Sequence, residues 1–243
     1  MNPYLKIAYQ PYKWLIVIPF IFILTMFMAS VCIAAGLVFH QGLAVNAIAV
    51  IWARLCCAVV PFFINIKGKE NYDPDQSYII VANHQSMADI PILQGYLGLK
   101  IKWIMKKELE KIPIFGFGCH QLGCIYVDRR NSAAAIKSIQ EAKTKLAKNA
   151  SVLFFAEGTR TRDGKLLPFK KGAFRFAKEI DLPILPITIE NSIDFLPSDS
   201  LDLIPGTIHI TVHPPVDISD HDIDELDSII KNTRNTIASA LRF

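Results

Sequence analysis

The chain has 243 residues, of which 51% are hydrophobic, and this apolar content lies near the upper edge for a soluble protein. The net charge of +4 conceals a separation of charge: residues 100–178 hold 18 bases and 6 acids, whereas residues 179–230 hold 12 acids and no Lys or Arg. Five cysteines without a Cys-x-x-Cys pair support neither a disulfide framework nor a zinc site, and we expect no metal. Nucleic-acid binding fits poorly with the apolar N-terminal quarter.

Two apolar segments open the chain. Residues 14–39 contain no charged side chain and are longer than the roughly 20 residues that a helix needs to cross a bilayer. A second apolar run, Leu43–Ile66, follows a short linker, and its Arg54 indicates partial immersion or packing against protein. We therefore expect a membrane-embedded hairpin of two helices at residues 1–65. A cleaved signal peptide is disfavoured, because its apolar core spans only ~7–15 residues.

The bases near the hairpin predict its orientation. Lys6 and Lys13 precede the first helix, Lys67 and Lys69 follow the second, and the turn between the helices has no Lys or Arg. The positive-inside rule then places both chain ends, and with them the domain at residues 66–243, on the cytoplasmic face of the membrane. The basic stretch at residues 100–178 would attract anionic lipid headgroups and phosphorylated substrates.

Residues 66–243 alternate short apolar runs with amphipathic ones. The runs predict strands at 77–82, 101–105, 125–127, 151–155 and 183–189, an edge strand at 207–213, and helices at 90–99 and 132–148. A last helix would follow Ser219, with Asp222 at the capping-box position. This order predicts an α/β domain with a mixed, largely parallel sheet flanked by helices. Residues 197–205 read as an exposed loop.

The first candidate for chemistry is a histidine with a carboxylate five residues later. His84 is the side-chain type best suited to accept a proton near neutral pH, and Asp89 can hold one imidazole nitrogen while the other faces the substrate. This spacing works if His84 ends a strand and Asp89 lies in the first turn of the next helix. Ser86 is too close to His84 to be its nucleophile, so the substrate would bring its own hydroxyl.

The second candidate is a phosphate site. Glu157-Gly158-Thr159-Arg160 directly follows a buried strand; the glycine permits close backbone approach, and a guanidinium matches phosphate oxygens. Glu157 is placed to orient Arg160. Lys106 and Arg129 end two other predicted strands. Because ligands bind at the carboxyl ends of strands in α/β folds, we expect these cations to converge with His84.

Several residues leave alternatives open. Phe115, Phe117, Ile112 and Ile114 would either line an acyl groove or fill the core, and Gly116–Gly118 reads as a turn. His209 and His213 share one face of a strand without a third metal ligand, so we interpret them as structural.

Four blocks in fixed order carry a resemblance to a known family. They are Asn83-His84-x-Ser86-x-x-Asp89, the Gly-x-Ile-x-Val-Asp-Arg run ending at Arg129, Phe155-x-Glu157-Gly158-Thr159-Arg160, and the strand Leu185-Pro186-Ile187. Over residues 65–215 the chain resembles the glycerolipid acyltransferases, and among them the 1-acylglycerol-3-phosphate (lysophosphatidic acid) acyltransferases. One departure is Ala156, where the family usually has proline.

The resemblance implies transfer of an acyl group from acyl-CoA or acyl carrier protein to the sn-2 hydroxyl of lysophosphatidic acid, which gives phosphatidic acid without an acyl-enzyme. His84 and Asp89 would be catalytic. Substrate-binding residues would be Asn83, Ser86, Lys106, Arg129, Glu157, Gly158, Thr159 and Arg160. No cofactor is expected beyond the acyl donor, and the partners are membrane lipids. The alternatives are another lysophospholipid acceptor, a thioester hydrolase, or a membrane lipid-binding module without chemistry.

Overall fold

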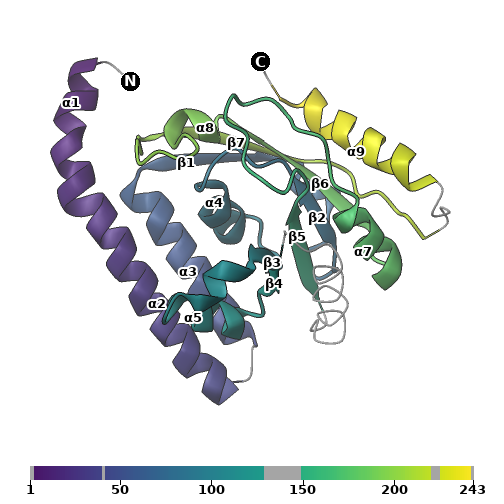
Figure 1. Ribbon diagram of the computed structural model, residues 1–243, viewed down its shortest axis with the longest axis horizontal. Helices are drawn as coiled ribbons and strands as arrows, with labels where there is room; N and C mark the ends of the chain where they lie inside the picture. Colours follow the sequence, from purple (N-terminus) through teal and green to yellow (C-terminus); the bar gives the residue numbers. More distant parts are fainter. Residues whose placement is uncertain (1–2, 40–41, 129–148, 220–224, 242–243) are drawn as a thin grey trace.

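A long apolar helix forms one flank of the molecule. The computed structural model describes residues 3–39, 42–128, 149–219 and 225–241. Helix α1 (Pro3–Tyr12), a π-helical turn (Lys13–Val17) and α2 (Ile18–Phe39) run on without a break (Figure 1). Of the described helices, this one is long and apolar enough to cross a membrane, over the 33 residues Ile7–Phe39. Most of its apolar side chains face outward, which agrees with membrane association.

Helix α3 (Leu43–Val59) returns beside α2. Two contacts show that the pair is antiparallel: Trp52 Nε1 donates to Thr25 Oγ1 at 3.0 Å, and Cys32 Sγ lies 4.0 Å from the Val45 carbonyl. At 17 residues α3 is shorter than α2, and its Arg54 Nε donates to the Gly95 carbonyl at 2.9 Å. Arg54 therefore packs against protein, one of the two alternatives its charge allowed.

The chain leaves α3 directly into the sheet. The apolar run predicted to be helical to Ile66 ends its helix at Val59, and strand β1 begins at Phe62. The predicted boundary between a hairpin and an α/β domain, after residue 65, thus falls within β1. The sequence did not show this strand, because its apolar residues continue the apolar pattern of the helix.

Seven strands of the described residues form one sheet in the order β1-β7-β6-β2-β5-β3-β4. Neighbours are parallel except β6 and β7, so the predicted mixed, largely parallel sheet is confirmed. The prediction of an edge strand at 207–213 is wrong, because β7 lies between β1 and β6. The bounds are β1 Phe62–Lys67, β2 Ile79–Ala82, β3 Lys100–Lys106, β4 Ile125–Val127, β5 Ala150–Phe155, β6 Ile184–Glu190 and β7 Gly206–Val212.

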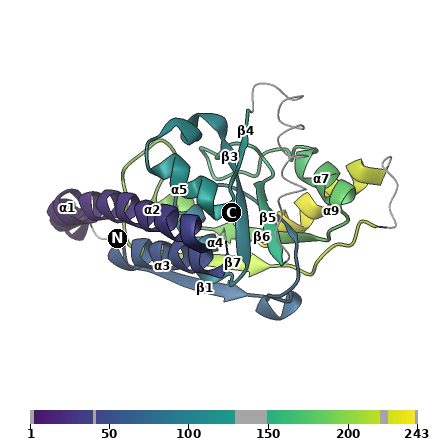
Figure 2. The same cartoon turned by 90° about the horizontal axis from the view of Figure 1, so that it is seen from below.

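Helices cover both faces of this sheet (Figure 2). Ile80 and Ala82 of β2 pack on the side of α3 and α4, whereas Ile79 and Val81 pack on the side of α7 and α9, as the alternation of a strand requires. The remaining helix bounds are α4 Asp89–Tyr96, α5 Phe115–Leu122, α7 Gly172–Ile180, α8 Ser192–Phe195 and α9 Leu226–Ser239, with short 3₁₀ turns at Lys69–Asn71 and Lys107–Lys111.

One local prediction differs from the structure, and others fall on residues that it does not describe. Gly116–Gly118 is not a turn but part of α5, where a Cβ at Gly118 would lie 2.9 Å from the Ala29 Cβ of α2, so glycine permits the two helices to touch. The predicted last helix is present as α9, Leu226–Ser239, and its predicted start after Ser219 falls on residues 220–224, outside the described residues. The predicted helix at 132–148 and the capping residue Asp222 lie outside the described residues.

Candidate active site

His84 and Asp89 meet at the carboxyl end of β2. His84 follows the strand by two residues, and Asp89 opens α4, as the spacing predicted. His84 Nδ1 lies 2.8 Å from Asp89 Oδ2, and that same oxygen accepts the backbone N–H groups of Gln85 and Ser86 at 2.8 and 2.9 Å. Since the carboxylate is an acceptor, Nδ1 carries the proton, and Nε2 of the neutral ring keeps its lone pair for a substrate.

The imidazole is also held from its face and from its backbone. The Phe155 ring stacks on it, with centroids 3.6 Å apart and planes 5° apart. Glu157 Oε1 accepts the His84 backbone N–H at 2.8 Å, and Glu157 Oε2 accepts that of Leu167 at 2.8 Å. The prediction that Glu157 orients Arg160 is therefore wrong. Burial raises the pKa of Glu157, and the two backbone hydrogen bonds offset part of that effect.

Residues 83–88 connect β2 to α4, and we call them the histidine loop. Asn83 and Ser86 hold this loop from within the protein. The Asn83 amide is buried and pairs with both the N–H and the C=O of Ile189, each at 2.8 Å. Ser86 is fully buried, and its hydroxyl donates to the Leu196 carbonyl at 2.8 Å. Both were predicted to bind substrate. With their polar atoms committed to main-chain groups, they instead fix the loop that carries His84.

The Glu157–Arg162 loop, which we call the guanidinium loop, lies beside the histidine loop. The Thr161 N–H donates to the His84 carbonyl at 3.0 Å. Gly158 has φ +73°, a left-handed conformation that glycine adopts without strain, and the side chain of Lys170 lies directly over it. Thr159 is exposed and Arg160 half-buried. His84 and the guanidinium loop are thus neighbours, as their places at strand ends predicted.

A segment predicted to be an exposed loop borders this site. We call residues Pro197–Leu203 the strap. The Ser198 hydroxyl lies 2.8 Å from the Thr161 carbonyl and 3.2 Å from the Gln85 carbonyl, so it joins the guanidinium loop to the histidine loop. Asp199 contacts both Arg160 and Arg162. Sequence reasoning missed these residues, since no local pattern reports a contact across 37 or 113 positions.

The other end of the strap reaches the N-terminal helix. Asp202 lies 3.6 Å from Nζ of Lys13, which is buried at the junction of α1 and α2 and also faces the Trp14 ring. Lys13, predicted to be a base flanking the membrane helix, therefore packs against protein. The strap links the N-terminal helix to the guanidinium loop.

Two of the predicted cations stand differently. Lys106 ends β3, which is separated from β2 by β5. Two strand spacings therefore put Lys106 about 10 Å from the end of β2 along the sheet edge. Its ammonium is half-exposed and 3.4 Å from Glu108. Arg129 lies outside the described residues.

Apolar side chains near the end of β3 are open to solvent. Ile112, Ile114 and Phe117 are 42%, 44% and 59% exposed, and Met87 in the histidine loop is 54% exposed. The first three therefore do not fill the core, which was one of the two alternatives. A contact with an acyl chain or with lipid stays a prediction.

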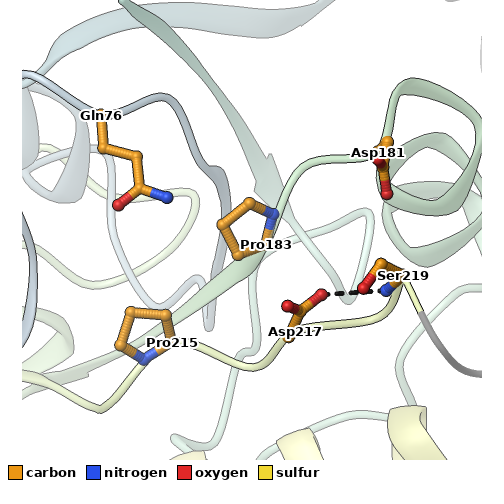
Figure 3. Close-up of a pocket in the computed structure, with 6 residues that line it drawn as sticks. All are labelled: Gln76, Asp181, Pro183, Pro215, Asp217 and Ser219. Carbon is orange, nitrogen blue, oxygen red and sulfur yellow. Dashed lines mark hydrogen bonds between the residues drawn. The ribbon is translucent and has the colours of Figure 1, made fainter.

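A surface pocket elsewhere is not this site. Gln76, Asp181, Pro183, Pro215, Asp217 and Ser219 line it (Figure 3). These residues lie near the amino ends of β2 and β6, whereas His84 follows the carboxyl end of β2. Its carboxylates would repel a phosphate. The described residues contain no group of three His, Cys, Asp or Glu placed to hold a metal ion, and the five cysteines are free thiols.

His213 has the structural part expected of it. Its Nε2 lies 2.8 Å from Thr188 Oγ1, whose proton goes to the Ile237 carbonyl at 2.9 Å. Nε2 is therefore the donor in the first bond, and it ties β7 to β6 and α9. Burial lowers the pKa of His213.

Comparison with known proteins places these features in a family context. Residues 63–190 match the Acyltransferase family. A 1-acyl-sn-glycerol-3-phosphate acyltransferase of Chlamydomonas reinhardtii is 33% identical over 238 residues, which cover 97% of this chain and 69% of that protein. A chloroplastic one from Arabidopsis thaliana is 34% identical over 197 residues, covering 80% and 53%. The chain thus spans about half the length of its chloroplastic relatives.

A solved structure has the same architecture. The crystal structure of the 1-acyl-sn-glycerophosphate (LPA) acyltransferase PlsC from Thermotoga maritima aligns with a TM-score of 0.72 at 26% identity, over 90% of this chain and 94% of that one.

Proposed function

Because this chain belongs to the acyltransferase family, we propose that it transfers an acyl group from a thioester to the sn-2 hydroxyl of 1-acylglycerol 3-phosphate, giving phosphatidic acid. The observation that carries the proposal is the juxtaposition at the sheet edge. His84, paired with Asp89 at 2.8 Å, is hydrogen-bonded through its carbonyl to the loop that holds Arg160. A base for a hydroxyl and cations for a phosphate are thus offered together. The relatives named above carry this activity in their names.

The acyl transfer is direct. Nε2 of His84 takes the proton of the acceptor hydroxyl as the oxygen attacks the thioester carbonyl carbon. The tetrahedral oxyanion then collapses, the carbon–sulfur bond breaks, and the imidazolium returns the proton to the thiolate. Asp89 holds the ring in the right tautomer and stabilises its charged form. Ser86, whose hydroxyl is buried and bonded to Leu196, takes no part as a nucleophile.

Arg160 and Arg162 bind the acceptor phosphate, together with Lys106 at the end of β3 and with Arg129, which lies outside the described residues. A guanidinium offers two parallel donors to phosphate oxygens, and this geometry orients the glycerol so that its free hydroxyl reaches His84. Gly158 and Thr159 shape the loop that presents Arg160.

The donor is an acyl thioester carried by coenzyme A or by acyl carrier protein. A thioester carbonyl is already activated toward attack, so the step draws on no redox group and no Lewis acid. The acidic surface of a carrier protein and the phosphates of coenzyme A would both be drawn to the basic residues of this half of the chain.

The apolar N-terminal helices hold the protein in the bilayer where lysolipid resides. We place the α/β domain on the cytoplasmic side, because Lys6 precedes the hairpin and Lys67 and Lys69 follow it. Membrane lipids then contact the outer side of the long N-terminal helix, whose exposed side chains include Leu15, Phe22, Ile23 and Phe27.

The test is an assay of the purified full chain in phospholipid vesicles. Labelled acyl-CoA and acyl carrier protein are each offered with lysophosphatidic acid, glycerol 3-phosphate, a neutral lysolipid, or no acceptor. We expect labelled phosphatidic acid with lysophosphatidic acid. Thioester cleavage independent of acceptor would show a hydrolase instead, and headgroup binding without turnover would show a lipid-binding module.

A further inference from the structure

One carboxylate bridges the two arginines of the guanidinium loop. Asp199 Oδ1 lies 3.4 Å from Arg160 Nη2, and Asp199 Oδ2 lies 3.2 Å from Arg162 Nη2. Each oxygen thus faces one guanidinium, which is the way two oxygens of a phosphate would divide between them. Asp199 comes from the acidic stretch of the chain, and its two partners come from the basic one.

Asp199 is held in place by its backbone and not by burial. Ser198, directly before it, is bonded to carbonyls of the histidine loop and of the guanidinium loop. Asp199 itself has φ +61°, a left-handed conformation that aspartate tolerates better than most residues. Its side chain is 58% exposed. The carboxylate therefore stands at the guanidiniums yet can rotate away into solvent without disturbing the core.

The strength of this bridge is modest. The side chains of Arg160 and Arg162 are 28% and 84% exposed, and both contacts are longer than a tight charge-assisted hydrogen bond. Ion pairs between exposed side chains are weak, because solvent screens them and two long side chains must be held in one geometry. A ligand that brings the guanidiniums more negative charge than the carboxylate does is therefore favoured to displace Asp199.

We propose that Asp199 makes the acceptor site selective for a phosphate monoester, by occupying Arg160 and Arg162 until a group of greater negative charge displaces it. A monoester carries a charge of about −1.5 to −2 at neutral pH, whereas a phosphodiester headgroup carries one negative charge, the same as Asp199. Lysophosphatidic acid displaces the carboxylate with a net gain of charge, and a lysophospholipid diester does not. Specific sites commonly reject the wrong partner in this way, by a repulsive or competing group.

The inference rests on the proposed function, because it concerns the choice between acceptors in the same reaction. A competing role for Asp199 and a purely structural role predict opposite effects on acceptor binding when Asp199 is removed. If Asp199 only oriented the guanidiniums, its removal would weaken the binding of every phosphorylated acceptor. If it competes with the acceptor, its removal helps the diester most.

The experiment compares the wild-type protein with Asp199→Asn in vesicles, with 1-acylglycerol 3-phosphate and lysophosphatidylglycerol of the same acyl chain as acceptors. We expect the ratio of kcat/KM for monoester over diester to fall about three- to fivefold in Asp199→Asn, through a lower KM for the diester. Asparagine keeps the left-handed backbone, and Asp199→Gly provides a second variant that does so. The thermal transition should match that of the wild type.

Asp227→Asn is the matched control. Asp227 also forms an exposed ion pair, with Lys171 at 2.6 Å, so its loss changes the net charge equally but leaves Arg160 and Arg162 untouched. Its acceptor ratio should stay at the wild-type value.

The pH dependence of the same ratio gives a second readout. The second ionisation of a phosphate monoester lies near pH 6, so at about pH 5.5 lysophosphatidic acid loses much of its charge advantage. Dividing one acceptor by the other cancels the titration of His84, since both reactions use it. The wild-type ratio should fall on acidification, and that of Asp199→Asn should fall less.

An unchanged ratio in Asp199→Asn, or a KM that rises alike for both acceptors, would overturn the inference while leaving acyl transfer to lysophosphatidic acid intact. Equal use of both acceptors by the wild type would overturn it too. Absence of transfer to any lysolipid would instead refute the proposed function.

Discussion

The imidazole of His84 lies flat on the ring of Phe155, 3.6 Å between centroids and 5° between planes. Asp89 fixes one edge of the imidazole, and Phe155 prevents the ring from turning about that bond. An aromatic face also favours the imidazolium that forms during proton transfer.

Replacing Phe155 with leucine should lower kcat about two- to tenfold with little change in KM, the size expected for a lost aromatic pair of ~0.5–1.5 kcal/mol. Phe154→Leu is the control. Its side chain points to the opposite face of the sheet, against Phe176, so it should lower the unfolding temperature and leave kcat near the wild-type value. Equal losses of kcat in the two variants would show that the effect comes from the sheet and not from the stacking.

His84→Ala should reduce turnover by about 10²–10⁴, the contribution typical of a general base. Asp89→Asn should approach the same loss. Asp89 Oδ2 now serves three donors, and an amide lacks the charge that stabilises the imidazolium. The measurement is the initial rate with both substrates saturating, with circular dichroism to show that each variant is folded. Near wild-type turnover in either variant would contradict the mechanism.

Glu157→Gln tests the carboxylate beneath the histidine loop. Glutamine has one acceptor oxygen for the two N–H groups that Glu157 now satisfies, so one buried donor faces an amide NH₂. We expect a loss of about 1–3 kcal/mol in the free energy of unfolding, and a lower kcat because the His84 backbone shifts. Glu70→Gln, the same change at an exposed position of the Lys69–Asn71 turn, should alter neither.

His213 makes folding stability depend on pH. Its pKa is lowered in the folded protein, so below about pH 6.5 the unfolded chain binds a proton that the folded chain does not. The free energy of unfolding should therefore be highest above that pH and fall as the pH drops through the folded-state pKa, by at most about 1.4 kcal/mol per pH unit. Denaturant titrations between about pH 5 and 7.5 measure this slope.

His213→Gln should flatten that dependence, although it lowers stability at neutral pH by removing the bond to Thr188. An identical slope in the variant would assign the dependence to other groups.

The elements that the sequence predicted are those with a complete local signature. Strands β2 to β6 are short apolar runs, and the spacing of His84 and Asp89 fits the end of a strand followed by a helix start. The strap, by contrast, has no such signature. Its meaning depends on Asp199 and Ser198 meeting residues that come close only in the folded chain. Helix α5 was missed because Gly116 and Gly118 read as turn residues, whereas packing against neighbouring segments explains both.

The family departure at Ala156 also acquires a physical reason only in the structure. Its N–H donates to the Ala82 carbonyl at 3.1 Å, which extends the pairing of β5 with β2 toward the histidine loop and the guanidinium loop. A proline at this position has no such donor. The loop that loses a stiff residue thus gains a hydrogen bond, and no sequence pattern announces that exchange.

Only Val60 and Pro61 separate helix α3 from strand β1. A link of two residues leaves no hinge, and α3 is further pinned to α4 through Arg54. The N-terminal helices and the sheet therefore move as one rigid body. In the membrane-bound protein His84 then stays at a fixed distance from the lipid. The headgroup of a lysolipid must therefore move out of the leaflet to reach His84, since no hinge at this link lets the sheet move toward the membrane.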